Sequence, residues 1–203
     1  MQAWTVGILL FDGVEVLDFA GPFEVFAVTA KSRGQADVFK PFVVSTIATS
    51  GKVVTANNGL KVVADYNLTD APWFDLLVVP GGQGTRREIN NAEVLGWIQR
   101  QHEAGQWTTS VCTGALLLAK CGLLDGKRAT THWASIEKMR QDFPGVTVLE
   151  NTKFVDEGPI VTSAGISAGI HMAFHMVRRL LGTETAKDTA RFMEYDIQFE
   201  GDE

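Results

Sequence analysis

The chain alternates short apolar segments with segments of helical periodicity, and no other feature of the sequence restricts its fold as strongly. Apolar runs rich in β-branched residues cover Trp4–Phe11, Leu76–Val79 and Trp107–Val111, as is typical of strands buried on both faces of a parallel sheet. Helical spacing predicts helices over Pro22–Lys31, Ala92–Ala104, Gly114–Cys121, His132–Asp142, Ala168–Leu181 and Glu184–Met193. The alternation predicts an α/β fold with a doubly wound, mainly parallel sheet, flanked by helices on both faces, that binds ligands at the carboxyl ends of its strands.

The segment from Phe39 to Ala64 departs from this alternation. It contains three β-rich pieces, separated by Ser50-Gly51 and Asn57-Asn58-Gly59, which favours a hairpin or an excursion at the sheet edge. The chain has no internal repeat, low-complexity tract or linker, and its 203 residues suit one domain. We therefore expect a single domain over residues 1–203.

Charge and composition exclude several classes of partner. The 18 Lys and Arg residues against 24 Asp and Glu residues give a formal charge of −6, so the chain has no electrostatic attraction for nucleic acid. No apolar run reaches the ~20 residues of a membrane span. Hydrophobic residues at 45% and charged residues at 21% are typical of a soluble globular domain.

The cysteines indicate a reducing compartment. Cys112 and Cys121 are nine residues apart in a segment predicted as helix, which places them about 13 Å apart and excludes a disulfide. No positively charged, apolar leader opens the chain, and free thiols are typical of reducing compartments. We expect a cytoplasmic protein.

The surroundings of Cys112 predict a nucleophile at a strand-to-helix turn. Cys112 follows the strand Trp107–Val111 and precedes a strong helix former, with Ser110 two residues before it and Gly114 two residues after it. Small flanking residues are needed at such a sharp turn, which holds its central side chain clear of the sheet. The start of the following helix should lower the pKa of the thiol. The alternative is a cysteine buried as a small apolar residue, the interpretation that we favour for Cys121.

Several spaced motifs stand out along the chain: Leu10-Phe11, Leu17-Asp18, Gly21-Pro22, Val79-Pro80-Gly81-Gly82, the stretch from Ser110 to Ala134, Thr162 to Ile170 and Glu194-Tyr195-Asp196. In this order they resemble the ThiJ/PfpI superfamily, which has a flavodoxin-like fold of the class I glutamine amidotransferase type. Within the superfamily the sequence is most similar to the isonitrile hydratase branch and to the ligand domains of certain AraC-type regulators.

The resemblance implies roles for six residues. Asp18, in the loop after the first strand, matches the acidic residue that hydrogen-bonds the cysteine, and would be a general acid beside Cys112; its alternative is a cap of the helix near Pro22. The resemblance further assigns oxyanion or substrate binding to Gly82, Thr113, Ile166 and His132, the last with a capping or purely hydrogen-bonded role as its alternative. The glycines of the turn at Gly82 lack the spacing of a nucleotide site, so no cofactor is expected.

Two pairs of polar residues have spacing or positions that only weakly indicate a metal site or an anion site. His171 and His175 have i, i+4 spacing, but no third ligand accompanies them, so we predict no metal. Arg86 and Arg87, near the expected pocket, are candidates for steering an anionic substrate, with simple solvation as the favoured alternative.

The resemblance implies a hydratase that adds water to an isonitrile, or to a similar small electrophile, through Cys112 and Asp18. Thr113 stands where many proteolytic relatives have a histidine, which counts against peptide hydrolysis. Two alternatives stay open: a stand-alone ligand-sensing domain related to AraC-type regulators, without a DNA reader beyond Arg191, and an amidase or glyoxalase-like hydrolase. The expected partners are a small-molecule substrate and a second copy in a homodimer, formed through Phe19, Phe23 and Phe26 of the first helix.

Overall fold

A seven-stranded sheet organises the chain, as the alternation predicts. The computed structural model describes residues 3–32 and 38–199. The strand order is β12-β13-β9-β8-β1-β4-β7, and every neighbouring pair is parallel except the antiparallel edge pair β12 and β13. The strands are β1 (Trp4–Leu10), β4 (Phe42–Ala48), β7 (Tyr66–Asn67), β8 (Leu76–Val79), β9 (Trp107–Val111), β12 (Phe154–Asp156) and β13 (Ile160–Ser163).

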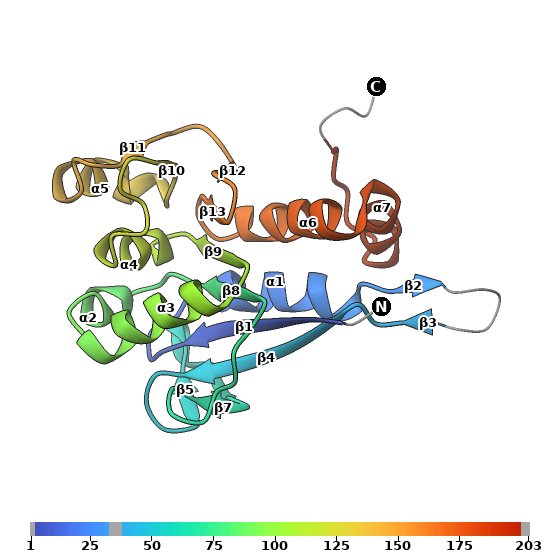
Figure 1. Ribbon diagram of the computed structural model, residues 1–203, viewed down its shortest axis with the longest axis horizontal. Coiled ribbons are helices and arrows are strands. Elements are labelled where there is room, and N and C mark those ends of the chain that lie inside the picture. The colour runs from blue at the N-terminus through green and yellow to red at the C-terminus, as the bar shows by residue number, and fades with distance from the viewer. Residues whose placement is uncertain (1–2, 33–37, 200–203) are drawn as a thin grey trace.

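Helices cover both faces of the sheet, so the predicted fold class is confirmed. The helices are α1 (Val16–Val28), α2 (Thr85–Glu88), α3 (Ala92–Ala104), α4 (Gly114–Lys120), α5 (Ile136–Asp142), α6 (Ala168–Leu181) and α7 (Thr183–Phe192). Helix α1 packs against α6, which packs against α7, whereas α3 packs against α4 (Figure 1). Within the described ranges, none of these helices has both the length and the apolarity needed to cross a membrane.

Three small β elements lie outside the main sheet. β2 (Lys31–Ser32) and β3 (Val38–Phe39) form a pair that projects from one end of the molecule (Figure 1). β5 (Val53–Thr55) and β6 (Lys61–Val63) form the hairpin expected in the middle segment, joined through the 3-10 turn η1 (Asn57–Gly59). β10 (Arg128–Ala129) pairs with β11 (Thr147–Val148), and a second 3-10 turn, η2 (Trp133–Ser135), precedes α5.

Helix α1 begins six residues before the position that Pro22 suggested. A proline inside a helix removes a hydrogen bond at a typical cost of about 3 kcal/mol, so the sequence favoured a start at Pro22. The structure instead buries Pro22 within α1, where Gly21 lies so close to α6 that an added Cβ would be 2.8 Å from Ile170. Tertiary packing therefore outweighs the local preference. As a result Asp18 lies in the first turn of α1, neither in a loop nor at a cap, since Glu15 is the N-cap residue.

Two of the three phenylalanines expected at a dimer surface are part of the chain's own core. Phe26 is fully buried, with its ring centroid 5.0 Å from that of Phe42, and Phe19 is buried as well. Phe23 is partly buried and packs against the same core. Phe19 and Phe26 therefore belong to the chain's own core and do not form an exposed partner surface, whereas Phe23 stays partly accessible. The homodimer itself stays a prediction.

Candidate active site

The segments that follow four neighbouring strands converge at the carboxyl edge of the sheet. Asp18 follows β1, the glycine turn at Gly81 follows β8, Cys112 follows β9, and Ile166 follows β13. The site lies next to the switch point between β1 and β8, where a doubly wound sheet opens a crevice. A pocket of about 230 Å³ is present there, lined among others by Cys112, Thr113, Ile166, His132, Gly82 and Glu15. The carboxyl-edge location matches the expectation from the sequence.

Cys112 occupies a strained turn between β9 and α4. Its φ is +55°, a conformation that non-glycine residues adopt at a cost on the order of 1–3 kcal/mol. The turn is tightly packed: an added Cβ on Gly114 would lie 2.0 Å from the carbonyl oxygen of Val79. The Cys112 N–H donates to the carbonyl oxygens of Ser163 and Ala164 at 3.2 Å. The predicted strand–turn–helix geometry is thus confirmed, and β13 holds it in place.

Asp18 is a fully buried carboxyl group beside Cys112. Its Oδ2 accepts the Gly81 N–H at 2.9 Å, while Oδ1 is buried and has no hydrogen-bond partner among the described residues. Burial raises the pKa of Asp18 to about 7, against the lowering effect of the Gly81 N–H; the charge of Glu15 raises it further, and the Cys112 thiol and the Ile166 N–H lower it. Asp18 therefore exchanges a proton near neutral pH, as a general acid or base requires.

The Cys112 thiol is more strongly protonated than the sequence suggested. Burial, followed by the negative charge of Asp18, raises its pKa to about 12, although the N–H groups of Thr113 and Ile166 and the Thr113 side chain act in the opposite direction. The expected lowering of this pKa by the start of α4 is therefore wrong, because desolvation of the sulfur is the larger effect. Asp18 and Cys112 titrate as a pair that holds one proton between pH values of about 7 and about 12.

The N–H groups of Thr113 and Ile166 lower the pKa of the Cys112 sulfur, whereas the Gly82 N–H has another partner. The Gly82 N–H, expected as an oxyanion donor, donates to Thr113 Oγ1 at 3.0 Å. The backbone requires glycine at position 82, because φ is +129° and an added Cβ would lie 2.3 Å from the carbonyl oxygen of Gly13. The Thr113 hydroxyl also accepts a hydrogen bond from Thr85 Oγ1 at 3.1 Å. The N–H groups of Thr113 and Ile166, from the segments after β9 and β13, are thus the backbone groups that favour a negative charge on the sulfur.

Comparison with known families agrees with this fold. Residues 5–179 match the model of the DJ-1/PfpI family, a match that covers most of the chain and all of the carboxyl-edge site. The chain belongs to the DJ-1/PfpI family.

The relatives of this DJ-1/PfpI chain include an enzyme and regulators. Isonitrile hydratase of Pseudomonas putida is 34% identical over 194 residues, which is 96% of this chain and 79% of that protein. The transcriptional regulator GbdR of Pseudomonas aeruginosa is 28% identical over 95% of this chain, which spans about half, 51%, of the regulator's length. Among solved structures, a ThiJ/PfpI family protein from Pseudomonas syringae superposes with a TM-score of 0.84 at 27% identity, covering 98% of this chain and 78% of that one.

His132 both caps a turn and lines the pocket of this DJ-1/PfpI domain. Its Nδ1 accepts a hydrogen bond from the Ala134 N–H at 3.3 Å, which caps η2. This is the capping role that the sequence left open as an alternative. Its ring also packs on Gly165, where an added Cβ would lie 2.2 Å from His132 Cδ2. The cap therefore fixes the imidazole at the pocket wall beside Cys112.

The remaining histidines and the second cysteine lie away from Cys112. His171 and His175 border a separate hollow of about 310 Å³ beside α6, where His171 Nε2 contacts Lys153 Nζ at 2.8 Å and His175 Nε2 contacts Asp156 Oδ2 at 2.7 Å. Each imidazole thus has its own partner, and the described residues contain no cluster of three metal-ligating side chains. Cys121 is buried at the end of α4, its Sγ 3.5 Å from the Leu95 carbonyl oxygen, and burial raises its pKa to about 11.

Two pocket residues, Glu15 and Asn57, were not predicted from the sequence. Asn57 Nδ2 donates to Glu15 Oε2 at 2.9 Å, and the Asn57 N–H donates to the Val14 carbonyl oxygen at 2.8 Å. These contacts dock the β5–β6 hairpin against the start of α1. The available signal was the Asn-Asn-Gly turn, which predicted the hairpin but not where the hairpin packs.

Proposed function

We propose that this DJ-1/PfpI protein hydrates small isonitriles to N-substituted formamides, with Cys112 as nucleophile and Asp18 as the group that transfers protons. The observation that carries the proposal is the buried pair itself: a carboxyl whose pKa is raised to about 7 faces a thiol at a strained turn in an open pocket. The 34% identity with the isonitrile hydratase of Pseudomonas putida, over 96% of this chain, supports the same reaction class.

The chemistry needs one shared proton and one water molecule. Asp18 accepts the thiol proton as the Cys112 sulfur attacks the terminal carbon of the isonitrile, and the same proton is then delivered to that carbon, giving a thioimidate. Water adds to the thioimidate carbon, with Asp18 relaying a proton to nitrogen. The tetrahedral intermediate collapses, the carbon–sulfur bond breaks, and the thiol regains its proton. The sum is isonitrile plus water to formamide, with the enzyme unchanged.

The direct test is product formation from a neutral aliphatic isonitrile. Cyclohexyl isocyanide incubated with the protein should give N-cyclohexylformamide, detected by mass spectrometry and by loss of the isonitrile infrared band, at rates proportional to protein concentration. Heat-unfolded protein at the same concentration is the control for uncatalysed hydration. Absence of formamide above this control, with neutral and carboxylate-bearing isonitriles alike, would reject the proposed reaction.

The pH dependence of kcat/KM should reveal the Asp18 pKa. The reactive state has one proton on the Cys112–Asp18 pair, and below a pH of about 7 a second proton fills Asp18. We therefore expect kcat/KM to fall by about tenfold per pH unit below pH 7 and to be level from about pH 8 to 10. Initial rates at low substrate concentration across this range measure it. A profile that rises as the pH falls below 7 would contradict the assignment of the proton.

The regulator relatives support a second candidate function, ligand sensing without turnover. GbdR matches this domain over 95% of the chain, so the carboxyl-edge pocket is also a candidate sensor site. Saturable binding of an isonitrile, measured by calorimetry, with no formamide after prolonged incubation would favour sensing over hydration.

A further inference from the structure

An arginine at the active-site pocket has a charge that no carboxylate in the described part of the chain neutralises. Arg86, in the short helix α2, lines the same pocket as Cys112. Among the described residues, its guanidinium makes one side-chain hydrogen bond, from Nη1 to Gln83 Oε1 at 2.7 Å, and Gln83 is neutral. Both side chains are exposed at the pocket rim. An arginine held by an amide keeps most of its donors for a ligand.

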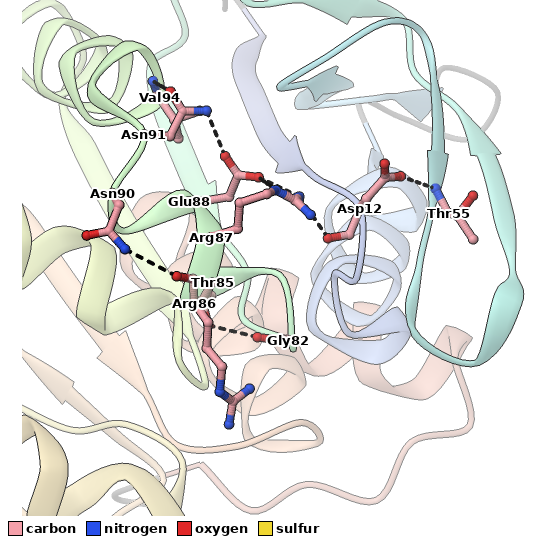
Figure 2. Close-up of polar contacts among 10 residues, drawn as sticks. All are labelled: Asp12, Thr55, Gly82, Thr85, Arg86, Arg87, Glu88, Asn90, Asn91 and Val94. Atoms are coloured by element: carbon pink, nitrogen blue, oxygen red, sulfur yellow. Dashed lines mark hydrogen bonds and ion pairs between the residues drawn. The ribbon is translucent and has the colours of Figure 1, made fainter.

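The neighbouring Arg87, unlike Arg86, is paired with a carboxylate. Its Nε and Nη2 donate to Oε1 of the buried Glu88 at 2.8 and 2.5 Å, and Nη2 also donates to the Asp12 carbonyl oxygen at 3.0 Å. In Figure 2 the Arg87 side chain extends toward Glu88 and Asp12, whereas Arg86 extends in a different direction, toward none of the carboxylates drawn. Arg87 thus stabilises the fold, and of the two arginines only Arg86 faces the pocket.

The pocket is polarised between Arg86 and Glu15. Glu15 also lines it, is held by Asn57 at 2.9 Å, and acts electrostatically on Asp18. An anionic substituent is therefore repelled from the α1 side of the pocket and attracted to the α2 side. Opposite charges on two walls orient a ligand as well as bind it.

We propose that the pocket is built for a small molecule that carries a carboxylate, which Arg86 binds while the electrophilic carbon of the molecule lies against the Cys112 sulfur. This assignment of a substrate rests on the proposed function, and it narrows the substrate class to isonitriles that carry a carboxylate. The planar guanidinium pairs with a carboxylate through two parallel hydrogen bonds. A pocket of about 230 Å³ holds a molecule of the size of isocyanoacetate or one slightly larger.

Alkylation of Cys112 by two nearly isosteric reagents tests the charge preference without relying on turnover. Iodoacetate and iodoacetamide transfer their methylene carbon to the thiolate with loss of iodide, and differ in that the first is an anion and the second is neutral. The ratio of their rate constants at Cys112 is measured at one pH by mass spectrometry of the Cys112 peptide. It gives the preference of the pocket for a carboxylate over a neutral amide. Wild type is compared with Arg86→Gln and with Arg100→Gln; the second removes an equal charge from an exposed residue of α3 outside the pocket.

We expect the iodoacetate-to-iodoacetamide ratio to fall by about tenfold in Arg86→Gln, the size of effect typical of a charge-assisted hydrogen bond. The ratio in Arg100→Gln should stay within about twofold of wild type, because net charge alone acts weakly at a distance in salt. A change in Arg86→Gln no larger than that in Arg100→Gln would overturn the proposal.

Turnover assays separate failure of this inference from failure of the proposed reaction. If cyclohexyl isocyanide gives its formamide and the alkylation ratio does not respond to Arg86→Gln, hydration stands and the carboxylate site is wrong. If neither cyclohexyl isocyanide nor isocyanoacetate is hydrated but the ratio falls in Arg86→Gln, the carboxylate site stands and the reaction must be sought among other electrophiles that carry a carboxylate.

Discussion

Replacement of Cys112 by serine should reduce the hydration of cyclohexyl isocyanide by at least about 10³-fold, because the hydroxyl is a far weaker nucleophile than the thiol at the same position. The loss should appear in kcat rather than in KM, since the pocket lined by Thr113, His132 and Ile166 is unchanged. Steady-state rates of formamide formation, followed to the limit set by uncatalysed hydration, measure the effect. Cys112→Ala should behave in the same way.

The fold should tolerate these changes, so that loss of activity can be assigned to chemistry. Cysteine, serine and alanine all have a Cβ and meet the same strain at φ +55°, and the backbone hydrogen bonds of residue 112 do not use its side chain. Cys121→Ala is the matched control, because it removes the other buried thiol outside the pocket. Near-normal turnover in Cys112→Ser, or a loss in Cys121→Ala as large as that in Cys112→Ser, would show that the nucleophile has been misassigned.

The sequence was sufficient to predict the elements with strong local signals. The bounds of α3 agree because Asn91 caps its first turn, accepting hydrogen bonds from the N–H groups of Glu93 and Val94. β9 and its turn agree because Gly114 occupies a position that has no room for a Cβ. Strand β13 was missed: it has four residues, and Thr162 and Ser163 are buried despite their hydroxyl groups. Here burial depends on neighbouring strands and leaves no local pattern.

The candidate site shows the same difference between features with a local signal and features that depend on tertiary contacts. Cys112 and Asp18 were named from motifs, and the structure brings them together. The position of Asp18 within α1, the docking of Asn57 on Glu15 and the raised pKa of the Cys112 thiol were not predicted, because each depends on contacts between segments far apart in the chain or on the degree of burial. Spacing indicates which residues carry chemistry, whereas the proton distribution between them is a property of the packed site.

Asp18→Asn should abolish proton transfer and, at pH 8, make the protein more stable. Burial holds the pKa of Asp18 at about 7, against 3.8 for an exposed aspartate, so the folded state binds this proton more tightly than the unfolded state does. The proton therefore favours folding at low pH, and its contribution is lost as the pH rises from about 4 through 7. The difference corresponds to at most about 4 kcal/mol of unfolding free energy.

Asparagine is neutral at every pH and does not suffer this loss. Its Oδ1 can still accept the Gly81 N–H, while its amino group takes the place of a buried oxygen that has no partner among the described residues, at a cost of about 1–3 kcal/mol. The net gain at pH 8 should be about 2 kcal/mol, or about 4–8 °C in Tm. At pH 5 most of the gain should vanish, because wild-type Asp18 is then protonated.

Urea unfolding of wild type and Asp18→Asn at pH 5 and pH 8 measures this difference, and the pH dependence of the gain is the decisive quantity. Cys112→Ala keeps the buried carboxyl, so it should keep most of the wild-type loss of stability between the two pH values and serves as the control. A gain in Asp18→Asn that is equal at both pH values would mean that Asp18 is already ionised in the fold at pH 5. In that case the carboxyl would act as a fixed charge beside Cys112, and the hydration mechanism would need another group to supply the proton.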